Sequence, residues 1–558
     1  MPKAFAPKVL FLSAKGAISA FAAWTASTVL TRLKFPSLQK VPSSLDEVAH
    51  DRVQVWTGYP WPGASENGAW LVSGLAQYPG GFESAINAFW NTTDAPGRHC
   101  FTWLSDLRAC GGDQARQTAR YLVASWIEQH GNQKTKSVWT LDYVGRRLTT
   151  LILLYDFHGS SAHDAYQALV GGMITRHADF LLKTLPTTRK SQDTLEASAA
   201  LILAALSMED KKQWRDIGEA HFTRNLSAQI LSDGGHISRA PQKLADVLRL
   251  CLDLKRFYQE ANQKPVETLQ KTIELMGEAL QFFRYMDKKL ALFHSSQEHS
   301  ATILDLISHQ IGGRLKTPKS LPTTKFERLT QGRTTVLMDI GTPPQWPYDT
   351  RASAAPLAFE MTYGKERMIV NCGAHPFSPE WQEALRGTAA HTTLDIDNRN
   401  ACEIKEDGHI GRKPSTIKSE RTEKKTSLLV EAQHDGYVPL NGLAHTRRLY
   451  LCERGQDLRG EDILSAGVAP EKHHDYALRF HLHPRVKVSL VKDETEALLR
   501  LPSGTGWRFQ QEGGALSLQD SIYFGEGTSP VKTQQIVMTG QTLSAVTLLK
   551  WAFQREGL

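Results

Sequence analysis

A short loop between two helix-like segments carries two side chains that could do chemistry. The stretch Ser232–Pro241 reads SDGGHISRAP and lies between HFTRNLSAQIL and QKLADVLRLCLDL. Its adjacent glycines favour a tight turn that presents His236 and Arg239 together. A histidine there could act as a general acid or base, and an arginine could hold an anion. The alternative is an ordinary connector whose histidine hydrogen-bonds the backbone.

A second group of candidate residues lies on a helix. In SVWTLDYVGRRLTTL, Trp139, Tyr143 and Arg147 are spaced at i, i+4 and i+8, with Arg146 beside them. Residues at this spacing share one face of a helix. An indole, a phenol and a guanidinium in a row suit a sugar that carries a carboxylate, because the indole stacks on the ring and arginine binds the acid. The alternative is an amphipathic helix with a core tryptophan and a structural arginine.

A third group consists of histidines in the second half of the chain. Nine of the 20 histidines lie between His375 and His483. His391 lies in LRGTAAHTTLDID and His434 in EAQHDGY, both of which read as parts of strands. Histidines from several strands could hold one zinc ion, with His391 and His434 among its ligands. The alternative is the polar face of a sheet that is wet on one side.

Helical spacing dominates the segment that should position the first two groups. In QKLADVLRLCLDLKRFY, apolar residues recur near i, i+3, i+4, i+7 and i+10. This is the stripe of a helix that packs on one side. Similar stripes recur through Leu45–Ala301 with short polar or Gly/Pro breaks between them. Many amphipathic helices in series predict antiparallel helical hairpins.

The hydrophobic period changes after about residue 320. Segments such as TTVLMDI, KTSLLVEA and YALRFHLHP alternate or run short between Gly, Pro, Asn and Asp. Short strands with frequent turn signals predict a β-sandwich. The segment KTPKSLPTTK marks the joint. We therefore expect an N-terminal extension at 1–45, a helical domain at 46–318 and a sandwich at 325–558.

Composition narrows the function classes. The 558 residues carry a net charge of +7 and no long Lys/Arg block, which argues against nucleic acid as a partner. A mild positive charge suits an anionic substrate. The N-terminal apolar run is interrupted by Lys15 and falls short of the roughly 18 residues that span a bilayer. The six cysteines form no Cys-x-x-Cys pair and indicate free thiols.

Together these stretches resemble the heparinase II/III-like family over about residues 90–550. The likeness is carried by RNLSAQILSDGGHISRAP, LAFEMTYGKERMIVNCGA, RGTAAHTTLDID, HDGYVPLNGLAHTRRLYL, LRGEDIL and FHLHP. The resemblance implies an α+β multidomain fold, an incomplete (α/α) toroid of helical hairpins followed by an antiparallel β-sandwich. It also implies a polysaccharide lyase of the bacterial cell envelope or periplasm, although the absence of a clear signal peptide leaves a cytoplasmic location open.

The implied reaction is β-elimination on a uronic-acid glycan. One group neutralises the uronate carboxylate, a tyrosine or histidine removes the C5 proton, and another protonates the leaving oxygen. The resemblance places His236 and His391 in the family's site motifs as catalytic residues, and the helical face adds Tyr143 as a third. For substrate binding, the resemblance points to Arg239 and Arg147, and the helical face adds Trp139 and Arg146. The expected partner is an anionic polysaccharide or oligosaccharide, and no cofactor is expected to be required. A structural zinc ion and a homodimer remain two further possibilities.

The sequence departs from the family pattern at two places. The helix before the loop reads DTLEASAALILA and lacks the usual Asn-His pair, and APQKLADVL after the loop lacks the usual tyrosine. Three hypotheses follow: a uronate lyase, a glycoside hydrolase that uses a carboxylate pair such as Glu196 and Asp233, and a glycan-binding or envelope-assembly protein that has lost the lyase site.

Overall fold

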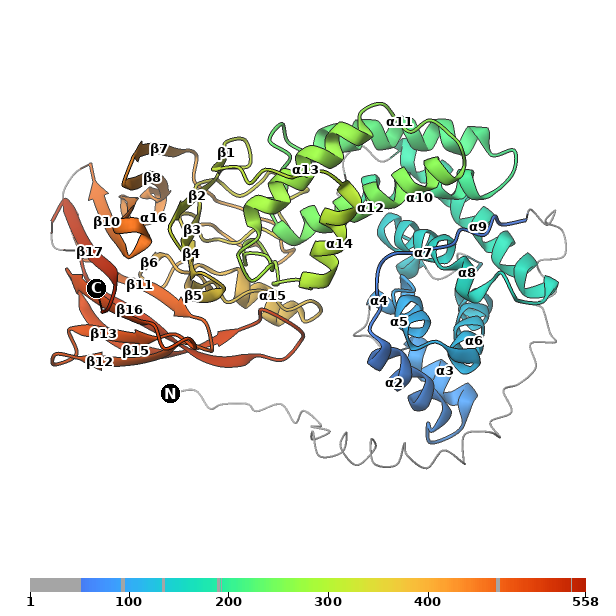
Figure 1. Ribbon diagram of the computed structural model, residues 1–558, viewed down its shortest axis with the longest axis horizontal. Coiled ribbons are helices and arrows are strands. Elements are labelled where there is room, and N and C mark those ends of the chain that lie inside the picture. Colours follow the sequence, from blue (N-terminus) through green and yellow to red (C-terminus); the bar gives the residue numbers. More distant parts are fainter. Residues whose placement is uncertain are drawn as a thin grey trace.

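Helices and strands occupy separate halves of the chain in the computed structural model shown in Figure 1. The structure describes residues 52–91, 96–132, 136–187, 191, 193–467, 472–542 and 544–557. The extension expected at 1–45 lies outside these ranges. No helix among the described residues combines the length and the apolar character that crossing a bilayer requires.

The helical domain is built from helices that follow one another with short connections. In chain order they are α2 (Ser65–Ala76), α3 (Phe82–Asn91), α4 (Pro96–His99), α5 (Trp103–Cys110), α6 (Gly112–His130), α7 (Leu141–Leu153), α8 (Tyr155–His158), α9 (Asp164–Thr184), α10 (Thr194–Ser207), α11 (Lys212–Gln229), α12 (Pro241–Glu260), α13 (Leu269–Phe283) and α14 (Ala301–Ile311). The 3-10 turns η3 (Lys136–Val138) and η4 (Leu185–Thr187) lie among them.

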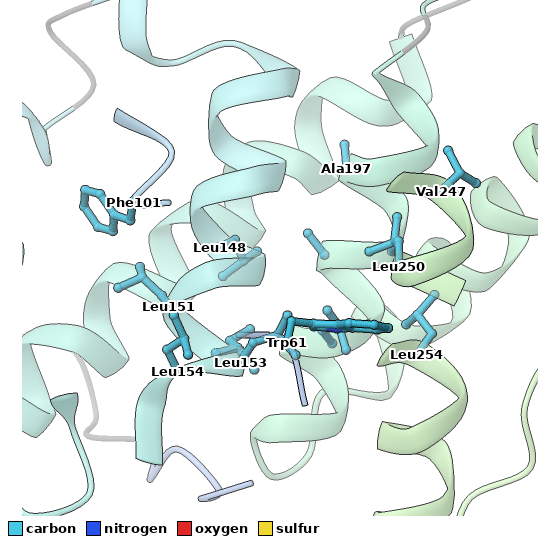
Figure 2. Close-up of a cluster of buried hydrophobic side chains, with 14 of the residues drawn as sticks. Trp61, Phe101, Leu148, Leu151, Leu153, Leu154, Ala197, Val247, Leu250 and Leu254 are labelled. Atoms are coloured by element: carbon cyan, nitrogen blue, oxygen red, sulfur yellow. The ribbon is translucent and has the colours of Figure 1, made fainter. Parts of the chain in front are cut away.

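The burial of each helix follows from its pattern of apolar residues. Helix α12 begins with Pro241 in its first turn, where a missing N–H costs nothing, and it buries the stripe found in the sequence. Helix α10 is apolar on every side and is buried along nearly its whole length, so it forms the centre of the domain. Figure 2 shows the core beside it, where Trp61 lies among leucines of α7 and α12.

The C-terminal half forms two antiparallel sheets. One has the order β1-β2-β3-β4-β5-β11-β16-β15 with β6 also paired to β11, and the other has the order β12-β13-β14-β17-β10-β9-β8-β7. The strands of the first are β1 (Ser320–Leu321), β2 (Phe326–Gln331), β3 (Thr334–Asp339), β4 (Phe359–Tyr363), β5 (Glu366–Val370), β6 (Leu394–Ile396), β11 (Asp475–Leu482), β15 (Ala515–Tyr523) and β16 (Val531–Gln541).

The strands of the second sheet are β7 (Ile417–Lys424), β8 (Ser427–Tyr437), β9 (Leu443–Cys452), β10 (Asp457–Ala466), β12 (Lys487–Val491), β13 (Glu496–Arg500), β14 (Gly506–Glu512) and β17 (Val546–Arg555). Short helices α15 (Pro379–Arg386) and α16 (Val438–Asn441), with turns η5 (Thr388–Ala390) and η6 (Glu453–Gly455), complete this half.

Aromatic side chains join the inner faces of the two sheets. Phe359 on β4 stacks on Trp551 of β17 with ring centroids 5.5 Å apart, and Phe480 on β11 packs edge-on against Trp551 at 4.9 Å. The arrangement is a β-sandwich whose core is separate from that of the helices. The last helix of the helical domain ends at Ile311, and the first strand begins at Ser320, inside the segment KTPKSLPTTK.

The SDGGHISRAP loop forms the joint between the two domains. The Asp233 carboxylate accepts hydrogen bonds from the backbone N–H groups of Thr323 and Thr324, each at 2.8 Å. The Arg239 guanidinium donates to four backbone carbonyls and pairs with Asp339; the carbonyls belong to Thr324, Lys325, Gly341 and Thr342. This loop therefore attaches the last helices to the first strands of the sandwich.

The two glycines of this loop are required by close packing. Gly234 has a φ of +83°, and a Cβ there would lie 2.1 Å from the carbonyl oxygen of Leu275 on α13. A Cβ on Gly235 would lie 1.9 Å from the Thr324 hydroxyl oxygen. The glycines let the loop fit between a helix and the sandwich, which explains why a helix-rich chain needs them here.

We expect Arg239→Ala to lower the free energy of unfolding by about 3–5 kcal/mol, because it leaves the buried carboxylate of Asp339 without its guanidinium partner. Urea and thermal unfolding midpoints measure this loss. The control is Arg448→Ala, which removes a half-exposed arginine paired with Glu431 and Glu461 and should cost less than about 1 kcal/mol. Equal losses of unfolding free energy in the two variants would show that the buried pair at the joint contributes no more to stability than an exposed one.

Candidate functional site

His236 and Arg239 do not lie on an open rim. His236 is 2% exposed and Arg239 is 6% exposed. The His236 imidazole contacts the Ser238 hydroxyl at 2.7 Å and the Gln229 side-chain oxygen at 3.2 Å. Burial, with the nearby charges of Lys243 and Arg351, holds the pKa of His236 well below its usual range. The prediction that these two side chains face a substrate is wrong, because both are buried: His236 is held by Ser238 and Gln229, and Arg239 is held at the domain joint.

Arg147 is also an interior residue. Its side chain is fully buried and donates to the His177 imidazole at 2.8 Å, the His99 carbonyl at 2.8 Å and the Val138 carbonyl at 3.2 Å. Its guanidinium carbon lies 3.9 Å from the centre of the Trp126 ring. Burial lowers the pKa of Arg147 to about 9. The expectation that Arg147 grips a substrate carboxylate is therefore corrected: this guanidinium holds helices together.

The two aromatic residues that were expected to share a helical face differ in burial, and Trp139 lies two residues before α7 begins at Leu141. Trp139 is buried, donates from its indole to the His130 carbonyl at 2.7 Å and stacks on His177 with centroids 4.9 Å apart. It cannot offer a face to a sugar, so the predicted stacking role is wrong. Tyr143 is partly buried and packs edge-on against the His99 ring at 6.1 Å. Burial raises the pKa of Tyr143, so the phenol stays protonated at neutral pH and offers little phenolate to act as a base.

His391 lies inside the sandwich, close to the joint. It is 4% exposed, and its Nδ1 lies 2.8 Å from the Gly387 carbonyl oxygen. Burial lowers the pKa of His391 to about 4. It is neutral at physiological pH and has no open surface for a substrate, so the structure gives its predicted catalytic role no support.

His434 belongs to a buried chain of hydrogen bonds. Its Nδ1 accepts from the Gly436 N–H, so its Nε2 carries the proton and donates to His445 at 3.2 Å. The other nitrogen of His445 donates to Asp462 at 2.7 Å. Within the described ranges, no three His, Cys, Asp or Glu side chains are grouped as metal ligands. His391 and His434 therefore do not fit a zinc site, because the nitrogens of His434 are used by protein partners.

A cleft of about 520 Å³ opens in the helical domain and reaches the sandwich. Charged side chains form much of its wall. They are Asp106, Asp142, Arg146, Asp193, Glu196, Lys243, Asp246, Arg249, Asp253 and Arg351. The wall also includes Tyr59, hydroxyl groups of Thr102, Ser105, Thr149 and Thr150, and apolar side chains such as Leu153 and Leu250. Of the residues singled out from the sequence as site residues, Arg146 lies on this wall.

Two of the four positive charges on the cleft wall are paired with acids of the same wall. Arg146 lies 3.7 Å from Asp142 on the next turn of α7, and Lys243 of α12 pairs with Glu196 of α10. The described wall carries six carboxylates and four cationic side chains. An anionic substrate would therefore meet a net negative wall, and it would have to compete with acids for the arginine and lysine.

Several titratable groups on the wall have shifted pKa values, and Asp253, Asp193 and Tyr59 are among them. Burial raises the pKa of Asp253 to about 6, although its carboxylate accepts from the Trp61 indole at 2.9 Å. Burial and the neighbouring charges of Asp142 and Glu196 raise the pKa of Asp193 to about 6. Burial and the charge of Asp253 raise the pKa of Tyr59 to about 12. The acids are mostly ionised at neutral pH, whereas the phenol is protonated.

The carboxylate pair considered for a hydrolase does not form. Asp233 is used at the joint with Thr323 and Thr324, and Glu196 is paired with Lys243 in the cleft. The acids Asp142, Asp193 and Glu196 do lie near enough to influence each other's charge. Sequence reasoning named Glu196 but not Asp142 or Asp193. Asp193 precedes Glu196 at the start of α10, and the packing of α7 against α10 brings Asp142 near them.

Two sequence profiles match this chain. The profile described as heparinase II/III N-terminus matches residues 106–309, and the profile described as heparinase II/III-like, C-terminal, matches residues 313–552. Among curated proteins, the chain is similar to the FtsZ-localized protein C of Caulobacter vibrioides. The two are 29% identical over an alignment of 549 positions, which covers 91% of this chain and 90% of that protein.

Solved structures share the fold. A crystal structure of heparinase III matches with a TM-score of 0.72 and 13% identity, covering 92% of this chain and 88% of that one. A mutant of the heparan sulfate lyase HepC from Pedobacter heparinus matches with a TM-score of 0.62 and 13% identity, covering 92% and 86%. These likenesses confirm the predicted fold class of toroid and sandwich, and at such identities they concern the fold alone.

Two neighbouring arginines on α7 provide a matched test of burial. Arg147→Ala removes three buried hydrogen bonds and should lower the free energy of unfolding by about 3 kcal/mol or more. Arg146→Ala removes a half-exposed side chain and should cost less than about 1 kcal/mol. Denaturant unfolding of both variants checks this, and a stable Arg147→Ala protein would contradict the interior role.

The pKa of Asp253 gives a pH-dependent prediction. Its folded-state pKa of about 6 lies above the roughly 3.9 of an unfolded aspartate. The stabilisation from the protonated form is complete below about pH 4 and is lost as pH rises through 6. Asp253→Asn stays neutral, so its stability relative to the wild type should grow by up to about 3 kcal/mol between pH 4 and pH 7. Denaturant unfolding of both proteins across this pH range measures the difference in their unfolding free energies. A difference that stays constant with pH would contradict the prediction.

Proposed function

The chain belongs to the heparinase II/III-like family, and on that premise we propose that it binds an envelope glycan without uronic acids and does not cleave it by β-elimination. The glycan occupies the cleft of the helical domain. The protein then acts in envelope assembly or cell division rather than in polysaccharide breakdown. A shared scaffold is compatible with this, because function is decided by the site.

The charge of the cleft wall is the observation that carries the proposal. Six carboxylates face four cationic side chains, and two of those cations already pair with acids in the wall. A uronate or sulfated glycan brings further negative charge and would be repelled. A neutral glycan instead offers hydroxyl and amide groups, which the carboxylates and threonine hydroxyls can bind while apolar ring faces contact the leucines.

Among its described wall residues, the cleft also lacks the histidine or ionised tyrosine that the lyase reaction was expected to use as its base. Its wall contains no histidine, and its phenol, Tyr59, has a pKa raised to about 12 by burial and by Asp253. A general base works best when its pKa lies near the working pH. The histidines predicted as bases, His236 and His391, are enclosed elsewhere by protein.

The similarity to an FtsZ-localized protein supports a role at the site of division. That relative covers nearly the whole chain and is more similar in sequence than the heparinase structures named above. A glycan cleft in a protein that works beside FtsZ would link the division apparatus to the envelope polymer. In this way the lyase-like fold would have a function in division without catalysing β-elimination.

A polysaccharide lyase is the second candidate, and the fold favours it. The match to heparinase III extends over both domains, so the two proteins share a fold. In that case Tyr59 would have to remove the proton and Arg146 would have to neutralise the uronate. Both roles are open to direct test.

We expect no ultraviolet-absorbing product when the purified protein is incubated with heparan sulfate, hyaluronan, alginate or glucuronan, because elimination would create a conjugated double bond. We expect calorimetry to show binding of N-acetylated chito-oligosaccharides, which carry no net charge. The double variant Asp142→Ala/Arg146→Ala removes exposed polar groups of the wall and should weaken this binding about tenfold or more, since hydrogen bonds to charged groups contribute about 1.5–3 kcal/mol each.

Two results would reverse the proposal. Product formation that disappears in Tyr59→Phe would establish the lyase reaction instead. Binding of glucuronan in preference to the neutral oligosaccharides would contradict the charge argument. A fluorescent fusion that does not coincide with FtsZ in dividing cells would remove the division role while leaving the glycan claim to calorimetry.

A further inference from the structure

A loop of the sandwich displays an exposed tryptophan near the cleft. The loop runs from Gly341 to Ser353 and reads GTPPQWPYDTRAS. The side chain of Trp346 is 59% exposed, although a large aromatic ring is usually covered in a folded protein. Neither the cleft wall nor the domain joint uses this ring.

Both ends of the loop are fixed at the joint. At its start, the Gly341 and Thr342 carbonyls accept hydrogen bonds from the Arg239 guanidinium at 3.1 and 3.2 Å. At its end, the Ser353 N–H donates to the imidazole of His294 at 3.1 Å, and the same imidazole contacts the buried Asp339. The loop therefore starts and finishes on one buried network.

The middle of the loop is fixed by the sandwich. The Lys413 ammonium donates to the carbonyls of Pro343 and Pro344 at 3.1 and 2.9 Å. The Asp349 carboxylate accepts from His409 Nδ1 at 2.7 Å and from the backbone N–H of Ile410 at 2.8 Å. A ring held on such a support loses little conformational freedom when it binds a ligand.

His409 extends the aromatic surface. Its ring lies 6.4 Å from that of Trp346, with 48° between the planes, and its contact with Asp349 fixes its orientation. Two aromatic rings at the surface, one of them an indole with a polar N–H, suit a ligand that has both apolar C–H faces and hydroxyl groups. A sugar ring is such a ligand.

The loop also joins this surface to the cleft. Arg351 lies five residues after Trp346 and contributes to the cleft wall. Five residues of chain span at most about 18 Å, so the tryptophan lies within that distance of the Arg351 backbone. A polysaccharide chain that leaves the cleft past Arg351 can reach the ring with its next few sugars.

We propose that Trp346, with His409 beside it, forms a sugar-stacking platform outside the cleft, which takes a ring of a glycan chain that is already held in the cleft. The platform rests on the proposed glycan-binding function and adds a preference for long chains over short ones. It binds by stacking and hydrogen bonding, and it performs no chemistry.

Calorimetry with N-acetylated chitobiose and chitohexaose tests the platform in the full-length protein. Trp346→Ala should weaken chitohexaose binding about tenfold and leave chitobiose binding unchanged, because a disaccharide in the cleft does not reach the loop. Trp346→Phe should restore most of the affinity. The matched control is Trp70→Ala on α2, a tryptophan that is 73% exposed and should affect neither ligand. Thermal midpoints of all variants should stay near that of the wild type.

The outcomes separate the two claims. Wild-type affinity of Trp346→Ala for chitohexaose would overturn the platform and leave the cleft function intact. An equal loss for chitobiose and chitohexaose would also overturn it, because the substitution would then act on the cleft itself. Failure of the wild type to bind either oligosaccharide would overturn the proposed function and the platform with it.

Discussion

The buried contact between Arg239 and Asp339 is the constraint on which the relation of the two domains depends. A guanidinium and a carboxylate removed from water must be paired and hydrogen-bonded, or each costs several kcal/mol. Here the guanidinium also satisfies backbone carbonyls of the strand β2 region and of the loop that starts at Gly341. Through that loop, the same contact fixes Arg351 on the cleft wall. The shape of the cleft is therefore tied to the joint.

Much of the fold could be predicted from the sequence. Three patterns show which side chains must be buried: the apolar stripe on α12, the apolar residues all around α10, and the change of hydrophobic period after residue 320. Few arrangements of the chain bury all of these side chains. The family resemblance then supplied the architecture. The fate of individual polar side chains was harder, because helical spacing says that Trp139, Tyr143 and Arg147 share a face but not whether that face meets a cleft or another helix.

The two adjacent arginines on α7 show this limit most clearly. Arg146 and Arg147 are chemically identical and differ by one position, yet one lies on the cleft wall and the other is enclosed by His177 and Trp126. Successive residues of an α-helix are rotated by about 100° around its axis, and this rotation directs one arginine to the cleft and the other into the core. Asp142 and Asp193 of the cleft were missed for the related reason that they come from separate elements. The Gly-Gly turn was a true signal of constraint, and the constraint proved to be packing against Leu275 and Thr324.

The partners of Arg239 are mostly carbonyl oxygens of the main chain, and this has a consequence for divergence. A carbonyl is present whatever side chain its residue carries, so Thr324, Lys325 and Thr342 can be replaced over generations without removing an acceptor. Of the side chains in this contact, only those of Arg239 and Asp339 need to persist. Because this contact uses backbone atoms rather than side chains, the sequences of the two domains can diverge while their relative position is kept. The surfaces of the two domains can then acquire new functions.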